Sequence, residues 1–231
     1  MAFSGKNLFF RIVPPSFVKM IRGKGGTIPS PFEEGILRNQ AIFIHVPKAA
    51  GSSIIIQLYG KSMYGHRRIG EFYADDPEKA AAFFKFSFVR NPWDRMLSAF
   101  SYLHQENGST VYDRDFSRKF LKPHADFNAF MLALEDLDYR AAVMKYIHFR
   151  PQARWICLPG EKTHAMDFLG RFETMEQDLA IVRERLGREA KPLAQVRPSK
   201  HLPYRDAYTD KTRRLIEEIY AEDIALLNYA F

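Results

Sequence analysis

The stretch AIFIHVPKAAGSSIIIQLY, from Ala41 to Tyr59, decides the fold. Its first residues alternate apolar side chains and predict a buried strand, while its last residues predict a helix. The loop between them, PKAAGSS, places small side chains around Lys48. Small side chains let backbone N–H groups approach an anion closely, and the following helix directs its positive end there. The loop is therefore expected to bind a phosphate-like group.

The order of residues in this loop separates it from the Walker A motif. Walker A needs G-x-x-x-x-G-K-[ST], in which the lysine follows the last glycine and a hydroxyl binds magnesium. Here Lys48 comes first and Gly51 three residues later. Taken alone, the loop leaves one alternative open, an ordinary strand–turn–helix with a solvated lysine, because short Gly/Ser motifs also occur by chance.

The composition indicates a globular protein with one folded domain. The chain has 231 residues, of which 46% are hydrophobic and 14% aromatic, and these fractions exclude a disordered protein. We expect residues 1–40 to form a basic, aromatic extension and linker, and residues 41–231 to form the functional domain.

The charge and the cysteine content indicate the class of ligand and the cellular location. The formal net charge of +7, from 34 basic and 27 acidic residues, favours anionic ligands without choosing among nucleotides, acidic glycans, nucleic acid and anionic membrane. The single cysteine, Cys157, excludes an intrachain disulfide and a cysteine metal cluster. We expect Cys157 to be a core residue and the location to be reducing and cytoplasmic.

Residues 1–24 carry five basic residues and no acidic one, interleaved with aromatic and aliphatic side chains. Their longest apolar run is too short for a signal-peptide core, and Pro14-Pro15 interrupts it. We therefore expect neither a cleaved signal nor a transmembrane span. Two interpretations stay open: a peripheral contact with the inner face of the membrane or with an anionic acceptor, and an extension that packs on the domain.

A second stretch, FSFVRNPWDRMLSAFSYL from Phe86 to Leu103, repeats the strand-to-helix pattern. A strand over 85–90 ends in Arg90, Asn91-Pro92 begins a helix, and Ser98 lies about two turns into it. Arg90 offers a forked, always-charged donor set that suits phosphate. Two such units predict an α/β fold of P-loop-like, three-layer type, with a central parallel sheet flanked by helices and the ligand at the carboxyl ends of the strands.

Other parts of the chain carry weaker signals. The segment 60–76 is polar and is expected to be irregular. The remaining expectations are a helix from Pro77 to Phe84 capped by Asp76, a helix capped by Asp126, a strand over 166–172, a capping box over Thr174–Gln177 ahead of a helix, and an amphipathic last helix over 210–228.

Together the two stretches resemble the sulfotransferase superfamily. The order P-K-x-x-G-[ST]-[ST] after a buried strand is similar to its 5′-phosphosulfate loop, and Arg90 and Ser98 have the spacing of its 3′-phosphate site. Later segments resemble the Golgi-type carbohydrate sulfotransferases and their bacterial members, over about Ile42 to Phe231. These segments are HFRPQ (148–152), GRFE (170–173), PYRDAYTD (203–210) and IYAEDIALLNYAF (219–231). One departure is GSS where GT-S or GTT is commoner, but the hydroxyls remain.

The resemblance implies a donor, an acceptor and a set of site residues. The donor would be 3′-phosphoadenosine 5′-phosphosulfate (PAPS), used without a metal, and the acceptor a hydroxyl or amine, most simply of a carbohydrate or glycolipid. The residues implied for the 5′-phosphosulfate are Lys48, Ala50, Gly51, Ser52 and Ser53, and those for the 3′-phosphate are Arg90 and Ser98. Lys48 would also neutralise charge on the leaving phosphate oxygen.

The acceptor's proton needs a base, and His66 is our first candidate, because histidine titrates near neutral pH and relatives carry their base in this segment. Glu71 is the second candidate, and a surface histidine is the alternative interpretation of His66. We expect His45 to be a structural neighbour of the loop. His148 either lines the acceptor cleft or braces its turn. Lys200 and Arg205 either reach a phosphate or an acidic acceptor, or belong to a solvated basic loop.

Three rival functions follow from the same features. A P-loop kinase would need a GK[ST] loop and a magnesium carboxylate, and the lysine-first loop argues against both. A nucleic-acid-binding module would fit the charge, but the basic residues are dispersed and form no known module, so we expect no nucleic-acid partner. A non-catalytic membrane adaptor would make residues 1–24 the main functional element.

Overall fold

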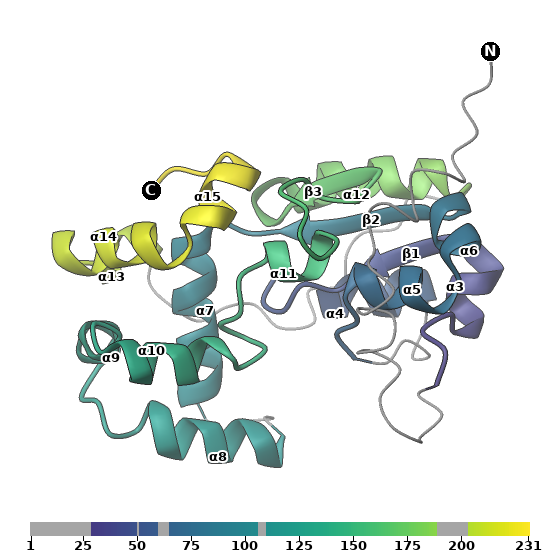
Figure 1. Ribbon diagram of the computed structural model, residues 1–231. Helices are drawn as coiled ribbons and strands as arrows, with labels where there is room; N and C mark the ends of the chain where they lie inside the picture. The colour runs from purple at the N-terminus through teal and green to yellow at the C-terminus, as the bar shows by residue number, and fades with distance from the viewer. Residues whose placement is uncertain (1–28, 50, 60–64, 106–109, 189–202) are drawn as a thin grey trace. The chain divides into compact units, whose positions relative to one another are not determined.

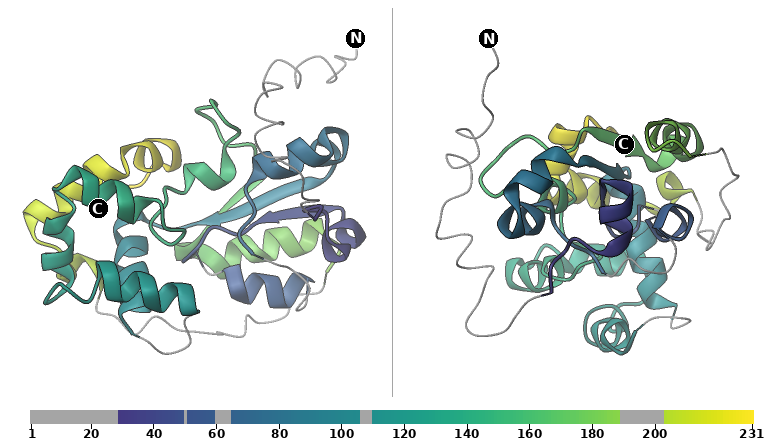
Figure 2. Two further views of the ribbon diagram at one scale, coloured as in Figure 1. Left: turned by 60° about the horizontal axis from the view of Figure 1, so that its bottom comes forward. Right: turned by 90° about the vertical axis from the view of Figure 1, so that its right-hand side faces the viewer.

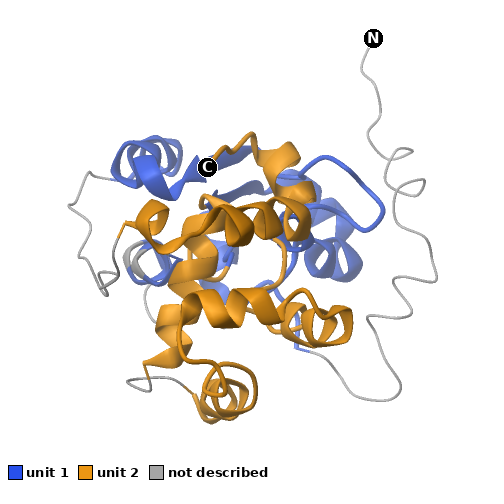
Figure 3. Cartoon of the chain, turned by 90° about the vertical axis from the view of Figure 1, so that its left-hand side faces the viewer, with its two compact units in different colours: residues 1–46, 50–89, 152–194 blue, residues 47–49, 90–151, 195–231 orange. Residues whose placement is uncertain are grey.

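The computed structural model describes residues 29–49, 51–59, 65–105, 110–188 and 203–231 (Figure 1). The chain divides into two compact units, which Figure 3 draws in different colours. Unit 1 comprises residues 1–46, 50–89 and 152–194, and unit 2 comprises residues 47–49, 90–151 and 195–231. The expected division into an extension over 1–40 and a domain over 41–231 stays a prediction, because residues 1–28 lie outside the described part.

Unit 1 is built on a parallel sheet with the strand order β1-β2-β3. The strands are β1 (Ala41–Ile44), β2 (Phe84–Val89) and β3 (Phe168–Arg171). Strand β1 is buried along its whole length, and β2 along all but its first residue, as expected for apolar runs in a sheet covered on both faces. The register pairs Ile44 with Ser87, and the Ser87 hydroxyl also donates to the Ile44 carbonyl at 2.7 Å.

Helices cover both faces of this sheet. Figures 1 and 2 show α4 and α12 on one face and α5, α6 and α11 on the other. The helical elements of unit 1 are α3 (Glu34–Asn39), α4 (Gly51–Tyr59), α5 (Ile69–Asp75), α6 (Pro77–Ala82), α11 (Ala153–Ile156), the 3₁₀ turn η2 (Phe172–Thr174) and α12 (Met175–Arg185). The predicted three-layer α/β fold with a central parallel sheet is therefore confirmed.

Unit 2 is helical and packs around aromatic side chains. Its helices are α7 (Pro92–His104), α8 (Val111–Phe120), α9 (Phe127–Ala133), α10 (Leu137–Met144), α13 (Tyr204–Ala207), α14 (Asp210–Ile219) and α15 (Ala221–Leu227). Helix α7 is buried along most of its length, and its residues Trp93, Met96 and Phe100 belong to the core. Phe100 packs against Phe127 and Phe130, with ring centroids 5.3 Å from each.

Several helix starts follow the sequence signals. Asp76 accepts a hydrogen bond from the backbone N–H of Lys79, with Pro77 in the first helical position, and Asp126 accepts one from Ala129. Side-chain acceptors at these positions satisfy N–H groups that have no partner inside the helix. The predicted caps at Asp76 and Asp126 are confirmed.

Three local predictions are wrong. Thr174 makes no capping hydrogen bond in the described structure, since the 3₁₀ turn η2 ends at this residue and its hydroxyl donates to Asp178 at 2.7 Å instead. The last helix breaks at Tyr220, whose buried hydroxyl donates to the Phe149 carbonyl, so tertiary contact overrides helical propensity. The segment expected to be irregular contains helix α5.

Across the described residues, no helix combines the length and the apolar character that crossing a bilayer requires.

Candidate functional site

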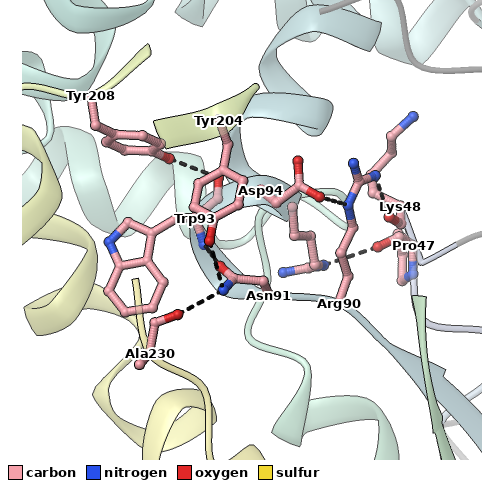
Figure 4. A network of polar contacts seen from close by, with 10 residues as sticks. Pro47, Lys48, Arg90, Asn91, Trp93, Asp94, Tyr204, Tyr208 and Ala230 are labelled. Atoms are coloured by element: carbon pink, nitrogen blue, oxygen red, sulfur yellow. Dashed lines mark hydrogen bonds and ion pairs between the residues drawn. The ribbon is translucent and has the colours of Figure 1, made fainter. Parts of the chain in front are cut away.

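Pro47 and Lys48 lie in the loop after β1, and two arginines of unit 2 hold their backbone. Figure 4 labels one of these arginines, Arg90, beside Pro47 and Lys48. Arg90 Nη1 donates to the Lys48 carbonyl at 3.2 Å, and Arg95 Nε donates to the Pro47 carbonyl at 2.9 Å. Lys48 has a φ of 68°, in the left-handed region that costs a non-glycine residue roughly 1–2 kcal/mol. The two hydrogen bonds therefore help to keep an otherwise unfavourable backbone conformation at the predicted phosphate-binding lysine.

The Lys48 side chain has an aromatic neighbour. Its Nζ lies over the ring of Tyr102, 4.0 Å from the centroid, in a cation–π contact. Tyr102 lies on α7, one turn beyond Ser98. The sequence did not predict a role for Tyr102, because the sequence of a helix does not show which cation an aromatic side chain will contact in the folded protein.

Arg90 follows β2 and is almost fully buried, with 3% of its surface exposed. Its Nε donates to Asp94 Oδ2 at 2.7 Å, in addition to the Lys48 contact. Asp94 lies in the first turn of α7, where the positive end of the helix favours a carboxylate. Ser98, the predicted partner of Arg90, lies on the same helix and is buried. The structure thus brings the Arg90 side chain into hydrogen-bond contact with the Lys48 carbonyl.

Asn91 fixes the start of α7 next to Arg90. Its Oδ1 accepts from the backbone N–H of Trp93 at 3.0 Å, and its Nδ2 donates to the Ala230 carbonyl at 2.9 Å (Figure 4). The Tyr208 hydroxyl donates to the Trp93 carbonyl at 2.9 Å. A residue near the end of the chain therefore helps to hold Asn91. The sequence around the helix start could predict the cap, but not this distant contact.

Arg95 is a buried residue whose importance the sequence did not reveal. Only 1% of its surface is exposed, and its guanidinium donates to the carbonyls of Pro47, His148 and Arg150 at 2.9, 3.2 and 2.8 Å. Arginine suits this role because its donors form a rigid fork and it stays charged. Arg95 lies in the stretch FSFVRNPWDRMLSAFSYL, but its acceptors are backbone groups far away in sequence.

His148 belongs to a buried polar cluster in unit 2. Its Nε2 lies 3.4 Å from Asp113 Oδ1, which also accepts from the Tyr146 hydroxyl at 2.5 Å. Burial alone would raise the pKa of Asp113, but hydrogen bonds from His148, Tyr146 and Thr110 outweigh it and hold the pKa well below its usual range. Burial lowers the pKa of His148, although Asp113 opposes this shift. The Tyr102 ring packs edge-on against His148, with centroids 5.2 Å apart.

In unit 1, Gly51 begins α4 directly against the imidazole of His45. A Cβ at this position would lie 1.8 Å from His45 Cδ2, so the close approach requires glycine. Ser52 and Ser53 follow in the first turn of α4, and Ser52 is exposed. Ala50 lies outside the described residues.

His66 also lies in unit 1 and is positioned by His45. Its Nδ1 is 2.9 Å from the His45 carbonyl, and the two imidazole centroids are 4.1 Å apart. A carbonyl oxygen only accepts hydrogen bonds, so Nδ1 carries the hydrogen. In the neutral ring Nε2 is then the nitrogen that can take up a proton. This is the tautomer that suits a general base.

Glu71 has a structural role. Its carboxylate accepts from the backbone N–H of Arg68 at 2.9 Å, just before the start of α5, and from Arg67 Nη1 at 3.0 Å. The carboxylate of Glu71, the second candidate base, is therefore used in contacts with neighbouring residues of its own segment. Arg205 is exposed and lies over the rings of Tyr204 and Phe231, and Lys200 lies outside the described residues.

Chemically, the loop and the start of α7 are suited to an anion. Lys48 and Arg90 supply two positive charges, of which that of Arg90 is paired with Asp94. Arg95 supports the loop from a buried position. Among the residues that the structure describes, no three His, Cys, Asp or Glu side chains gather as a metal site would need.

Comparison with known proteins gives one match. The sequence model described as "Sulfotransferase family" matches residues 38–230. No curated protein matches the chain, and no solved structure matches it. The matched range includes both strand-to-helix stretches and the later segments on which the sequence prediction rested, except for the final residue, Phe231.

Proposed function

Because the chain belongs to the sulfotransferase family and is an enzyme of sulfuryl transfer, we propose that it uses PAPS as donor and a carbohydrate or glycolipid as acceptor. One observation carries the donor assignment. Lys48 and Arg90, the two cations expected at opposite ends of PAPS, are joined by a hydrogen bond from Arg90 Nη1 to the Lys48 carbonyl. Residues placed on different faces of the protein could not share one donor molecule.

The proposed donor contacts follow the family pattern residue by residue. Lys48, Ala50, Gly51, Ser52 and Ser53 hold the 5′-phosphosulfate, and Arg90 and Ser98 hold the 3′-phosphate. The burial of Arg90 supports this assignment, because charge-assisted hydrogen bonds are stronger where water is excluded. The tight approach of Gly51 to His45 supports it as well, since backbone N–H groups at a glycine can come close to an anion.

The residues have distinct parts in the transfer. PAPS supplies the sulfuryl group, which forms a bond to the acceptor oxygen as the bond to the 5′-phosphate oxygen breaks, leaving 3′,5′-bisphosphoadenosine. Lys48 neutralises the negative charge that develops on the leaving phosphate oxygen. His66 accepts the acceptor's proton at Nε2, the nitrogen that its contact with His45 leaves as the basic one. No metal takes part in this scheme.

Sulfate transfer to an acceptor panel tests the proposal. Isotopically labelled PAPS is incubated with the protein and a set of glycans and glycolipids, and transfer is read by mass. We expect a mass increase of one sulfate on at least one carbohydrate, unaffected by a magnesium chelator. Transfer of phosphate from ATP that the chelator abolishes would instead support the kinase alternative. Failure to consume PAPS with any acceptor would count against the donor assignment.

The base assignment has its own test. His66→Ala should leave donor affinity unchanged and lower turnover by roughly 100- to 10,000-fold, the usual contribution of a general base. Glu71→Gln serves as the matched variant, because it keeps an oxygen acceptor for the Arg68 N–H and removes the charge. Normal turnover in His66→Ala together with a large loss in Glu71→Gln would reverse the assignment.

We also propose peripheral membrane contact through residues 1–24, which lie outside the described residues. Their five basic side chains and interleaved aromatics support this, since anionic lipid attracts basic segments by about 1 kcal/mol per Lys or Arg. Co-sedimentation with vesicles containing phosphatidylserine is expected for the full chain and not for a chain lacking residues 1–24. Equal co-sedimentation of both chains would refute it.

A further inference from the structure

Asp94 forms a short ion pair with the arginine assigned to the 3′-phosphate. Its Oδ2 accepts from Arg90 Nε at 2.7 Å, and the two side chains expose only 14% and 4% of their surface. We propose that Asp94 is a positioning residue, which sets the orientation of the Arg90 guanidinium for the 3′-phosphate of the donor. This inference rests on the proposed function, and it assigns a part to a residue that the sequence pattern leaves without one.

Two hydrogen bonds fix the plane of the guanidinium. Asp94 takes the Nε hydrogen, and the Lys48 carbonyl takes a hydrogen of Nη1 at 3.2 Å. Contacts at two different nitrogens of a planar group leave it little freedom to rotate. Since an arginine side chain loses rotamer entropy when a ligand orders it, ordering it before the ligand arrives lowers the cost of binding.

Asp94 is itself held in place by the start of α7. It occupies the first turn of this helix, after the Asn91 cap and Pro92. The backbone there is ordered by the Asn91 hydrogen bonds to Trp93 and Ala230. A carboxylate in this position gains from the positive end of the helix. Asp94 is therefore a rigid acceptor for Arg90.

Asp94 has two opposite effects on ligand affinity. Its hydrogen bond orders Arg90 and favours binding, whereas its negative charge repels a phosphate. Removing the carboxylate therefore abolishes both effects at once. Two uncharged substitutions separate these effects. Asp94→Asn keeps an oxygen at the same place for Arg90 Nε, whereas Asp94→Ala removes it. Both lack the charge, so the difference between them measures positioning.

The experiment compares two ligands that differ in the 3′-phosphate alone. Binding of 3′,5′-bisphosphoadenosine and of adenosine 5′-monophosphate to each variant is measured by ligand-observed NMR, which covers weak affinities. We expect the bisphosphate to bind Asp94→Asn about 3- to 10-fold more tightly than Asp94→Ala, as one hydrogen bond of ordering would give. We expect the monophosphate to bind the two variants equally.

Two results would overturn the positioning role. One is equal affinity of both variants for the bisphosphate, and the other is a difference of the same size for the monophosphate. Thermal unfolding of both variants checks that each is folded. The exposed pair of Arg118 and Asp115 supplies a matched control, for which Asp115→Asn and Asp115→Ala should bind both ligands alike. If the wild-type chain itself does not prefer the bisphosphate, the proposed function fails instead.

Discussion

Strands β1 and β2 each lead through a short loop into a helix, but the two loops obtain their support from different places. The loop after β2 has local support, because Asn91 caps α7, Pro92 begins it, and Asp94 of its first turn pairs with Arg90. The Ala230 carbonyl adds one distant contact to Asn91. The loop after β1 depends on distant residues. Arg90 and Arg95 hold the carbonyls of Lys48 and Pro47.

This difference shows how the two loops of the proposed donor site are connected. The Arg90 side chain contacts both loops, since it pairs with Asp94 in the first turn of α7 and donates to the Lys48 carbonyl. The residue that follows β2 therefore also supports the loop after β1. Substitutions that remove the support should damage the β1 loop more than those that remove the local cap of α7.

The largest effect is expected from Arg95→Met. This change leaves the carbonyls of Pro47, His148 and Arg150 without their buried donor. Since each unsatisfied buried group costs about 1–3 kcal/mol, the free energy of unfolding should fall by about 3–5 kcal/mol, as measured by urea denaturation. Arg118→Met, at an exposed position, should change it by no more than about 0.5 kcal/mol. Equal stability of the two variants would contradict the supporting role of Arg95.

An intermediate effect is expected from Gly51→Ala. The new Cβ meets the His45 ring, and such overpacking typically costs about 1–3 kcal/mol. In the background of His45→Ala the same change should cost nothing, because the ring is gone and the His45 carbonyl that holds His66 is retained. Thermal unfolding of the two single variants and the double variant measures this. Additive losses would mean that the ring contact is not the cause.

The smallest effect is expected from substitutions of Asn91, which caps α7 in the loop after β2. Asn91→Ala removes the cap of α7 and should lower the free energy of unfolding by about 1–2 kcal/mol. Asn91→Asp keeps the cap acceptor and loses the donor to the Ala230 carbonyl, so its loss should be smaller. Chemical denaturation of the three chains gives the order. Equal losses for the two variants would place the support in the contact with Ala230 rather than in the cap, because both variants lose that donor and only Asn91→Ala loses the cap acceptor.

Interactions between residues close in sequence could be predicted, and interactions between residues far apart in sequence could not. The caps at Asp76, Asn91 and Asp126 were predictable, because a cap bonds to N–H groups two or three residues away. The break at Tyr220 was not, since its hydroxyl bonds to Phe149, far away in the chain.

The same rule applies to the site. Lys48 and Arg90 could be named from spacing in two short motifs, and the structure brings them into contact. The acceptors of Arg95 and the ring of Tyr102 over which Lys48 lies come from segments that only the folded chain brings together. Local patterns therefore indicate candidate binding groups, and tertiary structure decides which contacts hold them.

The most direct test of the central claim is the affinity of the folded Arg90→Ala variant for 3′,5′-bisphosphoadenosine, measured by calorimetry beside the wild-type chain. If Lys48 and Arg90 hold one donor molecule, truncating this buried arginine should weaken binding by about 2–5 kcal/mol. An affinity equal to that of the wild-type chain would contradict the account.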